Sequence, residues 1–213
     1  MIFSIRRVVL PLVLLGSTLC GLTACFPLAA GGAVVGGMVA TDRRTTGTLV
    51  EDEGIELRAA SRIREAIGDR GHVNVTSYNR QVLLTGEVAS AQDKQQVEQI
   101  VTGVDNVRNI VNELAILGNS TLTQRYSDSV VTGRVLAGLL DASDLSTKAF
   151  KITTERGTTY VMGRVTPREA KRATEVISAT TGVQRVVRIL ETISEEELAR
   201  FRAAPPERLP AKP

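Results

Sequence analysis

The chain of 213 residues is 43% hydrophobic but only 3% aromatic, and it contains two cysteines, one histidine and no tryptophan. So few histidines and cysteines exclude a His/Cys metal cluster, and no nucleophile motif is present, so we predict no enzymatic activity. The net charge of +3 includes two N-terminal arginines, and the other 24 basic and 23 acidic residues disfavour nucleic acid as a partner.

The first element is a short apolar stretch that ends in a cysteine. Arg6 and Arg7 precede an apolar run over residues 8–19, which is typical of a secretory signal peptide and short for a membrane span. Residues 22–25 then read Leu-Thr-Ala-Cys, a lipobox pattern. We predict a lipoprotein signal peptide over residues 1–24, with covalent diacylglycerol and an N-acyl chain such as palmitate on Cys25, and no other cofactor. The alternative is an ordinary secretory signal with an incidental cysteine.

The next segment, residues 25–48, reads as a lipidated tether rich in Gly and Ala. Two or three acyl chains anchor a protein stably, because each buried methylene contributes about 0.8 kcal/mol. The apolar part over residues 26–40 is too short to span a bilayer. Phe26 stands where Asp favours retention at the inner membrane in enteric bacteria. We therefore predict a protein anchored in the inner leaflet of the outer membrane and facing the periplasm.

The rest of the chain contains an internal repeat. Residues 82–88 (Val-Leu-Leu-Thr-Gly-Glu-Val) match residues 159–165 (Thr-Tyr-Val-Met-Gly-Arg-Val). A Gly-Val-x-x-Val pattern follows each of them, at residues 103–107 and 182–186. We predict two domains, residues 49–118 and 119–194, followed by a C-terminal tail over 195–213 that is largely disordered.

Each copy reads as helix, strand, strand, helix, strand. Apolar residues four positions apart (Ala59, Ile63 and Ile67) indicate an amphipathic first helix, and Ser90 is a suitable N-cap for the second. We predict an α+β fold in which each αββαβ module is a three-stranded sheet with two helices on one face. The expected elements are helix 55–67, strands 73–75 and 82–88, helix 90–102 and strand 107–117, then helix 129–140, strands 150–154 and 158–165, helix 168–181, strand 186–193 and a short helix at 195–202.

An apolar strand ending in Gly, a helix and then Gly-Val-x-x-Val resembles the BON domain. Two such tandem modules behind a lipobox resemble the dual-BON-domain outer-membrane lipoproteins of the DolP (YraP) group. The similarity covers nearly all of the mature chain, including residues 40–42 (Ala-Thr-Asp), 74–76 (Asn-Val-Thr) and 168–171 (Arg-Glu-Ala-Lys). The resemblance implies a role in outer-membrane integrity and binding of anionic phospholipid through the first helix of the second module. It also implies association with the division site and with the outer-membrane protein assembly machinery.

A comparison of the two copies supports a lipid-binding face independently. The buried positions of the first helix stay apolar, but charged residues of the first copy become aliphatic in the second: Arg58 aligns with Val130, Arg64 with Leu136 and Glu65 with Ala137. Residues 50–118 carry 7 basic and 11 acidic residues, whereas residues 121–193 carry 11 basic and 7 acidic ones. Aliphatic side chains ringed by cations suit a membrane interface. The predicted phospholipid-binding residues are Val130, Arg134, Leu136, Ala137, Leu140 and Lys148.

Two alternatives remain open. The first helix of the second module could instead pack against the other module or against a partner protein. The protein would then be an envelope scaffold or adaptor that binds outer-membrane assembly proteins, with lipid contact secondary and with Leu136 and Leu140 as a protein hot spot.

Overall fold

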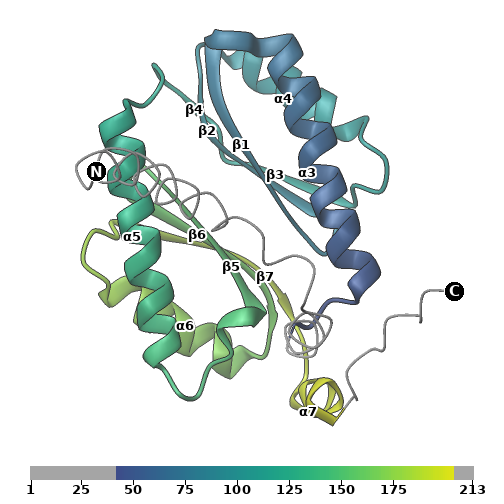
Figure 1. Cartoon of the computed structure of the whole chain (residues 1–213), viewed down its shortest axis with the longest axis vertical. Helices are drawn as coiled ribbons and strands as arrows, with labels where there is room; N and C mark the ends of the chain where they lie inside the picture. The colour runs from purple at the N-terminus through teal and green to yellow at the C-terminus, as the bar shows by residue number, and fades with distance from the viewer. Residues whose placement is uncertain (1–41, 204–213) are drawn as a thin grey trace, which may run out of the picture. The chain divides into compact units, whose positions relative to one another are not determined.

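The computed structural model describes residues 42–203, which belong to one compact unit (Figure 1). The predicted signal peptide, Cys25, the larger part of the predicted tether and the end of the tail lie outside the described residues. None of the helices among residues 42–203 is long and apolar enough to cross a membrane.

The first module has the predicted order of elements around one sheet. Strand β2 lies in the middle, antiparallel to β1 and parallel to β3 and β4. Helices α3 and α4 pack on the face that holds the first apolar cluster. The elements are α3 (Thr46–Ile67), a 3₁₀ turn η1 (Gly68–Arg70), β1 (Gly71–Tyr78), β2 (Gln81–Val88), α4 (Ala91–Thr102), β3 (Asn109–Asn112) and β4 (Ala115–Ile116).

The second module repeats this arrangement, with β6 between antiparallel β5 and parallel β7. Helices α5 and α6 cover one face and enclose the second cluster, which includes Val135, Leu139 and Ile177. Its elements are α5 (Leu122–Asp141), η2 (Thr147–Ala149), β5 (Phe150–Glu155), β6 (Thr158–Val165), α6 (Pro167–Ala179) and β7 (Arg185–Thr192), followed by α7 (Glu195–Ala203).

Both first helices begin earlier than predicted. Helix α3 starts nine residues before Ile55, because the Thr45 hydroxyl caps it by accepting the Thr48 N–H at 3.2 Å. Helix α5 starts seven residues before Ser129, where Thr121 and Gln124 form a capping box. The predicted boundary between tether and first module, at 48/49, therefore falls inside a helix. These added turns carry too few buried apolar residues to reveal a helical period in the sequence.

The last strand of the first module differs from the prediction, whereas the C-terminal helix agrees with it. The strand predicted over 107–117 is two short strands, β3 and β4, because the Asn112 side chain accepts the Leu114 N–H and interrupts the ladder. The short helix predicted at 195–202 is confirmed as α7, which ends at Ala203, and its Leu198 is buried. Arg164 holds this helix by pairing with Glu197 at 2.8 Å.

The two modules share a third apolar cluster. Side chains alternate along a strand, so the face of each sheet opposite its helices needs its own cover. Leu83 and Tyr78 of the first module and Tyr160, Met162 and Ile189 of the second supply that cover for each other. The two sheets thus meet through their helix-free faces, and we call this contact the seam.

Ion pairs across the seam use the charge imbalance seen in the sequence. Lys151 pairs with Glu56, and Arg156 pairs with fully buried Glu87, each at 2.5 Å. Arg185 pairs with Glu113 at 3.1 Å. Cations of the basic module thus pair with carboxylates of the acidic module. These charged side chains are engaged at the seam and are not available to an external partner.

Candidate functional site

Helix α5 presents an apolar stripe to solvent. Leu122, Tyr126 and Leu140 are 82%, 72% and 72% exposed, and Leu136 is 39% exposed. Leu122 and Tyr126 lie four residues apart, as do Leu136 and Leu140. Tyr126 and Leu136 are separated by about three helical turns, so all four side chains lie on one face of the helix. The opposite face, with Val131, Val135 and Leu139, fills the core of the module. We define the α5 stripe as Leu122, Tyr126, Leu136, Ala137 and Leu140.

The predicted lipid-binding residues fall into two groups. Leu136, Ala137 and Leu140 lie exposed in the α5 stripe, as expected. Val130 is half-buried and exposed Arg134 lies on the same flank, where its guanidinium donates to the Thr181 carbonyl at 3.4 Å.

Lys148 is also exposed, in turn η2, which packs against α5. Lys151 follows Lys148 closely in the sequence but does not add a second cation beside α5. It instead donates to Glu56 and to the Ser77 carbonyl across the seam.

Sequence reasoning missed Leu122 and left Tyr126 out of the predicted binding residues, because the helix was expected to begin at Ser129. A Leu-x-x-x-Tyr spacing just after the capping box is the signal that would have found them. The exposure of the stripe also decides one open alternative. Within residues 42–203, α5 does not bury this face against the first module.

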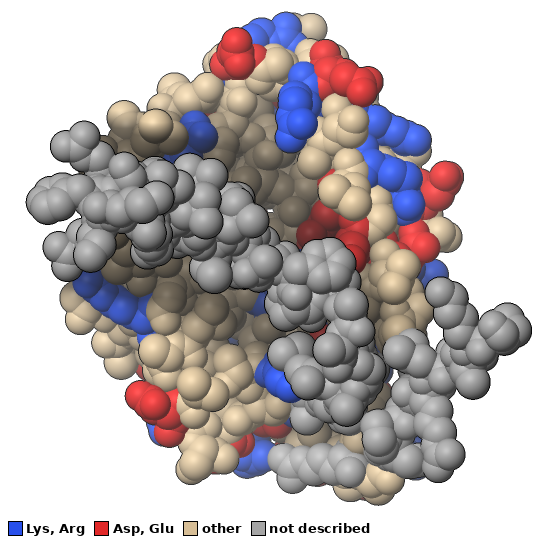
Figure 2. Space-filling model, viewed as in Figure 1, with Lys and Arg blue, Asp and Glu red and all other residues tan. Residues whose placement is uncertain are grey.

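The corresponding face of α3 has a different character. Val50 and Leu57 are 66% and 73% exposed, but charged residues follow at Arg64 and Glu65. Arg58 pairs with Glu51 at 2.6 Å on the same helix. Figure 2 shows Lys and Arg side chains next to Asp and Glu side chains over the α3 region, at the upper right. Among residues 42–203, the exposed apolar face therefore extends to the C-terminal end of the first helix only in the second module.

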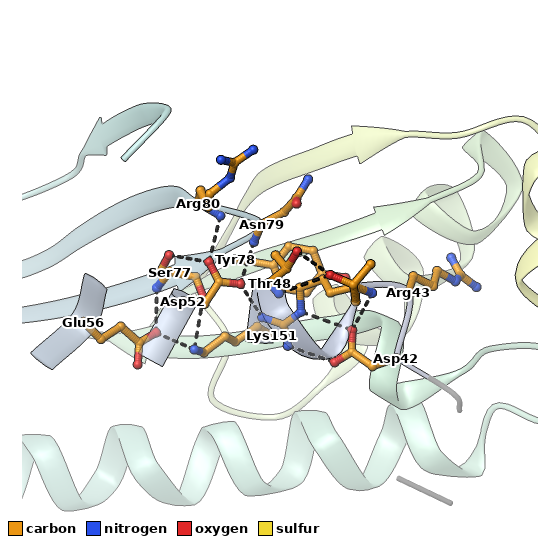
Figure 3. A network of polar contacts seen from close by, with 12 residues as sticks. Asp42, Arg43, Thr48, Asp52, Glu56, Ser77, Tyr78, Asn79, Arg80 and Lys151 are labelled. Carbon is orange, nitrogen blue, oxygen red and sulfur yellow. Dashed lines mark hydrogen bonds and ion pairs between the residues drawn. The ribbon is translucent and has the colours of Figure 1, made fainter. Parts of the chain in front are cut away.

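A polar network holds the start of the described chain against the first module (Figure 3). Arg44 donates to Asp42 at 2.9 Å and to Asp52 at 2.8 Å, and its guanidinium lies 4.2 Å from the centre of the Tyr78 ring. Asp52, which is 1% exposed, also accepts the N–H groups of Asn79 and Arg80 in the turn between β1 and β2. Helix α3, this turn and Arg44 are thereby tied together.

The neighbouring residue, Arg43, reaches the second module. It makes two hydrogen bonds to the Glu169 carboxylate, at 2.8 and 2.6 Å, and one to the Arg164 carbonyl. Arg43 and Glu169 are only 5% and 1% exposed. Burial disfavours the ionised form of Glu169, but hydrogen bonds from Arg43 and the Thr166 N–H outweigh it and lower the pKa of this carboxyl. Two consecutive arginines near the end of the predicted tether thus bind different modules: Arg44 binds the first and Arg43 binds the second.

Among residues 42–203, no group of three or more His, Cys, Asp or Glu side chains could hold a metal ion. The arrangement offers instead an exposed apolar surface, flanking cations and a fixed attachment point for the preceding chain. Such features suit association with a surface.

Comparison with known proteins identifies the repeated module. The BON domain family matches residues 56–118 and 127–192. The chain is 32% identical over 181 residues to the outer membrane lipoprotein DolP of Haemophilus influenzae, covering 84% of this chain and 93% of that protein. It is 28% identical over 154 residues to the 21 kDa hemolysin of Actinobacillus pleuropneumoniae, covering 71% and 79%. A solved C-terminal domain of CdsD, a structural protein of the Chlamydia trachomatis type III secretion system, is 12% identical, with a TM-score of 0.28 over 68% of this chain and 98% of that one.

Proposed function

The chain belongs to the BON-domain family, and we propose that it is a non-enzymatic, lipid-anchored outer-membrane protein that faces the periplasm. Its second module binds anionic phospholipid of the inner leaflet and so supports outer-membrane integrity. The lipobox ending at Cys25 and the similarity to an outer membrane lipoprotein over 84% of the chain support the location.

The α5 stripe is the observation that carries the proposed lipid binding. Each fully buried Leu contributes roughly 1.5–3 kcal/mol, so Leu122 and Leu140 alone give about 3–6 kcal/mol if the acyl boundary covers them. A cation near an anionic surface adds about 1 kcal/mol, and Arg134 and Lys148 are exposed beside the helix. These contributions suffice for reversible binding that reinforces a lipid anchor.

A stripe of this kind also suits a protein partner, such as an outer-membrane assembly protein or a component at the division site. The two occupants differ in what the flanking cations do. Lipid binding requires anionic headgroups and weakens with salt, whereas a protein hot spot depends on the shape of one partner.

The test is flotation of residues 41–213, which contain all three apolar clusters but lack the lipid anchor, with phosphatidylglycerol vesicles. Leu140→Glu places a carboxylate in the α5 stripe. Leu57→Glu is a matched control, because Leu57 is a leucine of nearly equal exposure on α3, the first helix of the other module.

We expect the wild type and Leu57→Glu to float with the vesicles and Leu140→Glu to remain at the bottom of the gradient while its circular dichroism is unchanged. If the wild type stays behind as well, the soluble modules do not bind lipid, and the scaffold function replaces this proposal. If both variants float as well as the wild type, the α5 stripe is not the binding face.

A further inference from the structure

A polar pocket of about 330 Å³ lies at the seam next to helix α5. This volume is at the lower end of the roughly 300–1,000 Å³ typical of small-molecule sites. Both modules contribute to its wall, which includes His72 and Asn74 of β1, Arg125, Ser129 and Thr132 of α5, and Glu155 of β5.

The pocket and the α5 stripe share an edge of the helix. Arg125, Ser129 and Thr132 follow one another at spacings of four and three residues, and Leu136 comes four residues later. Such positions form a single row along a helix. A molecule whose apolar part covers Leu136 therefore meets this polar row directly beside it.

Arg125 supplies a cation that no carboxylate neutralises by contact. Its Nε donates to the Ser120 hydroxyl at 3.1 Å, and within residues 42–203 it forms no ion pair. Ser120 in turn donates to the buried Glu87 carboxylate, which fixes the position of the arginine stem. The remaining guanidinium N–H groups are available to an anion.

The two carboxylates of the pocket have different roles. Asp128 accepts the N–H groups of Arg156 and Gly157 at 2.8 and 3.0 Å, so both of its oxygens are used in the turn between β5 and β6. Glu155 is hydrogen-bonded to the Asn74 amide, and burial raises its pKa. It is the carboxyl group left to accept a hydroxyl of a ligand.

The lining of α5 is peculiar to the second module. In the alignment of the two first helices, Arg125 stands opposite Glu53, Ser129 opposite Leu57 and Thr132 opposite Ala60. The first copy thus has an acid and two apolar residues where the second has a cation and two hydroxyls. Helix α5 thus carries both the apolar stripe and the polar row, whereas α3 lacks the polar row.

We propose that this pocket binds the phosphoglycerol headgroup of an anionic phospholipid, with the phosphate at Arg125 and the headgroup hydroxyls toward Glu155 and Asn74. The inference rests on the proposed function and deepens it: the α5 stripe takes the acyl boundary and the pocket takes the headgroup. A phosphate needs a cation and hydrogen-bond donors, which the Arg125 guanidinium and the Thr132 hydroxyl supply. The Ser129 hydroxyl is already used, because it donates to the Arg125 carbonyl at 2.9 Å. A glycerol needs an acceptor, which Glu155 supplies in the same wall.

The experiment combines a soluble headgroup with vesicles. Residues 41–213 labelled with ¹⁵N are titrated with glycerophosphoglycerol, and affinity for phosphatidylglycerol vesicles is measured separately. Arg125→Gln is compared with Arg188→Gln, which removes an exposed arginine of the same module that makes no ion pair among residues 42–203 and lies away from the pocket.

We expect glycerophosphoglycerol to shift the amide signals of Asn74 and Ser129, and Arg125→Gln to abolish these shifts and weaken vesicle binding about tenfold, as loss of a charged hydrogen bond does. Arg188→Gln should weaken vesicle binding less than about threefold, through general charge alone. If Arg125→Gln and Arg188→Gln weaken vesicle binding equally, the pocket is not the headgroup site.

The experiments distinguish an error in the headgroup assignment from an error in the proposed function. If Leu140→Glu abolishes vesicle binding and Arg125→Gln leaves it unchanged, the proposed function stands and the pocket is overturned. If glycerophosphoglycerol binds at the pocket but the wild type does not bind vesicles, the ligand is a free phosphate ester, and both the lipid assignment and the proposed function are wrong.

Discussion

Replacing Glu169 by Gln tests whether the arginine at the end of the tether holds the second module. The substitution keeps the shape of the side chain and an acceptor for the Thr166 N–H, but it leaves Arg43 without a counter-charge at a site where both residues are at most 5% exposed. Losing one partner of a buried ion pair costs roughly 3–5 kcal/mol. Because glutamine retains one acceptor, we expect a loss of about 3 kcal/mol.

The assay is urea unfolding of residues 41–213, followed by circular dichroism and evaluated by linear extrapolation. Glu175→Gln is the matched control on the same helix. Glu175 pairs with Arg172 at 3.7 Å, and both side chains are about half exposed, so its loss should cost less than about 1 kcal/mol.

The effect should depend on pH in a defined direction. Burial disfavours the charged form of Glu169, but Arg43 and Thr166 lower its pKa below the usual 4.5. Its contribution to stability is therefore present above the unfolded pKa and is lost as the pH falls through the folded one. The difference between wild type and Glu169→Gln should shrink from pH 7 to about pH 3. A loss at pH 7 no larger than that of Glu175→Gln would refute a stabilising role for this pair.

Three further outcomes follow from the fold. Leu83→Ala should destabilise the protein by about 2–5 kcal/mol, measured by urea unfolding, because Leu83 is fully buried in the seam cluster; an unchanged midpoint would mean that the seam contributes nothing. Ser90→Ala should lower the free energy of unfolding by about 1 kcal/mol, because the Ser90 hydroxyl caps α4, and a change below about 0.3 kcal/mol would contradict that role. Burial raises the pKa of Tyr78 to about 12 and also raises that of Tyr160, so ultraviolet titration should show an ionisation step near pH 12 that Tyr78→Phe removes, and a step that survives this substitution would contradict the assignment.

The modular fold could be predicted from the sequence because its signals are local. The repeated Gly-Val-x-x-Val and the four-residue spacing of Ala59, Ile63 and Ile67 report the order of elements without any knowledge of distant contacts. The first turns of α3 and α5 carry no buried apolar period, since Val50 and Leu122 face solvent there. In α5 only the capping box and the Leu-x-x-x-Tyr spacing mark the start of the helix.

The contact between the two sheets could not be predicted from local sequence patterns. Leu83 and Met162 look like ordinary strand residues, and only the structure shows that they point away from their own helices and toward the other module. The basic balance of the second module was read as favouring lipid, but Lys151 and Arg156 are used at the seam. Comparing the two copies was more informative than net charge, because it identified Leu136 and Leu140 as aliphatic residues that their own core does not bury.

The most direct test of the central claim measures where the α5 stripe lies when the protein meets a membrane. Residues 41–213 contain no cysteine, so Leu140→Cys or Leu57→Cys introduces a single thiol for an environment-sensitive fluorophore. With phosphatidylglycerol vesicles, we expect the label at position 140 to shift to the blue and to resist aqueous quenchers, while the label at position 57 stays accessible. Equal accessibility of the two labels in the presence of vesicles would contradict membrane binding through the second module.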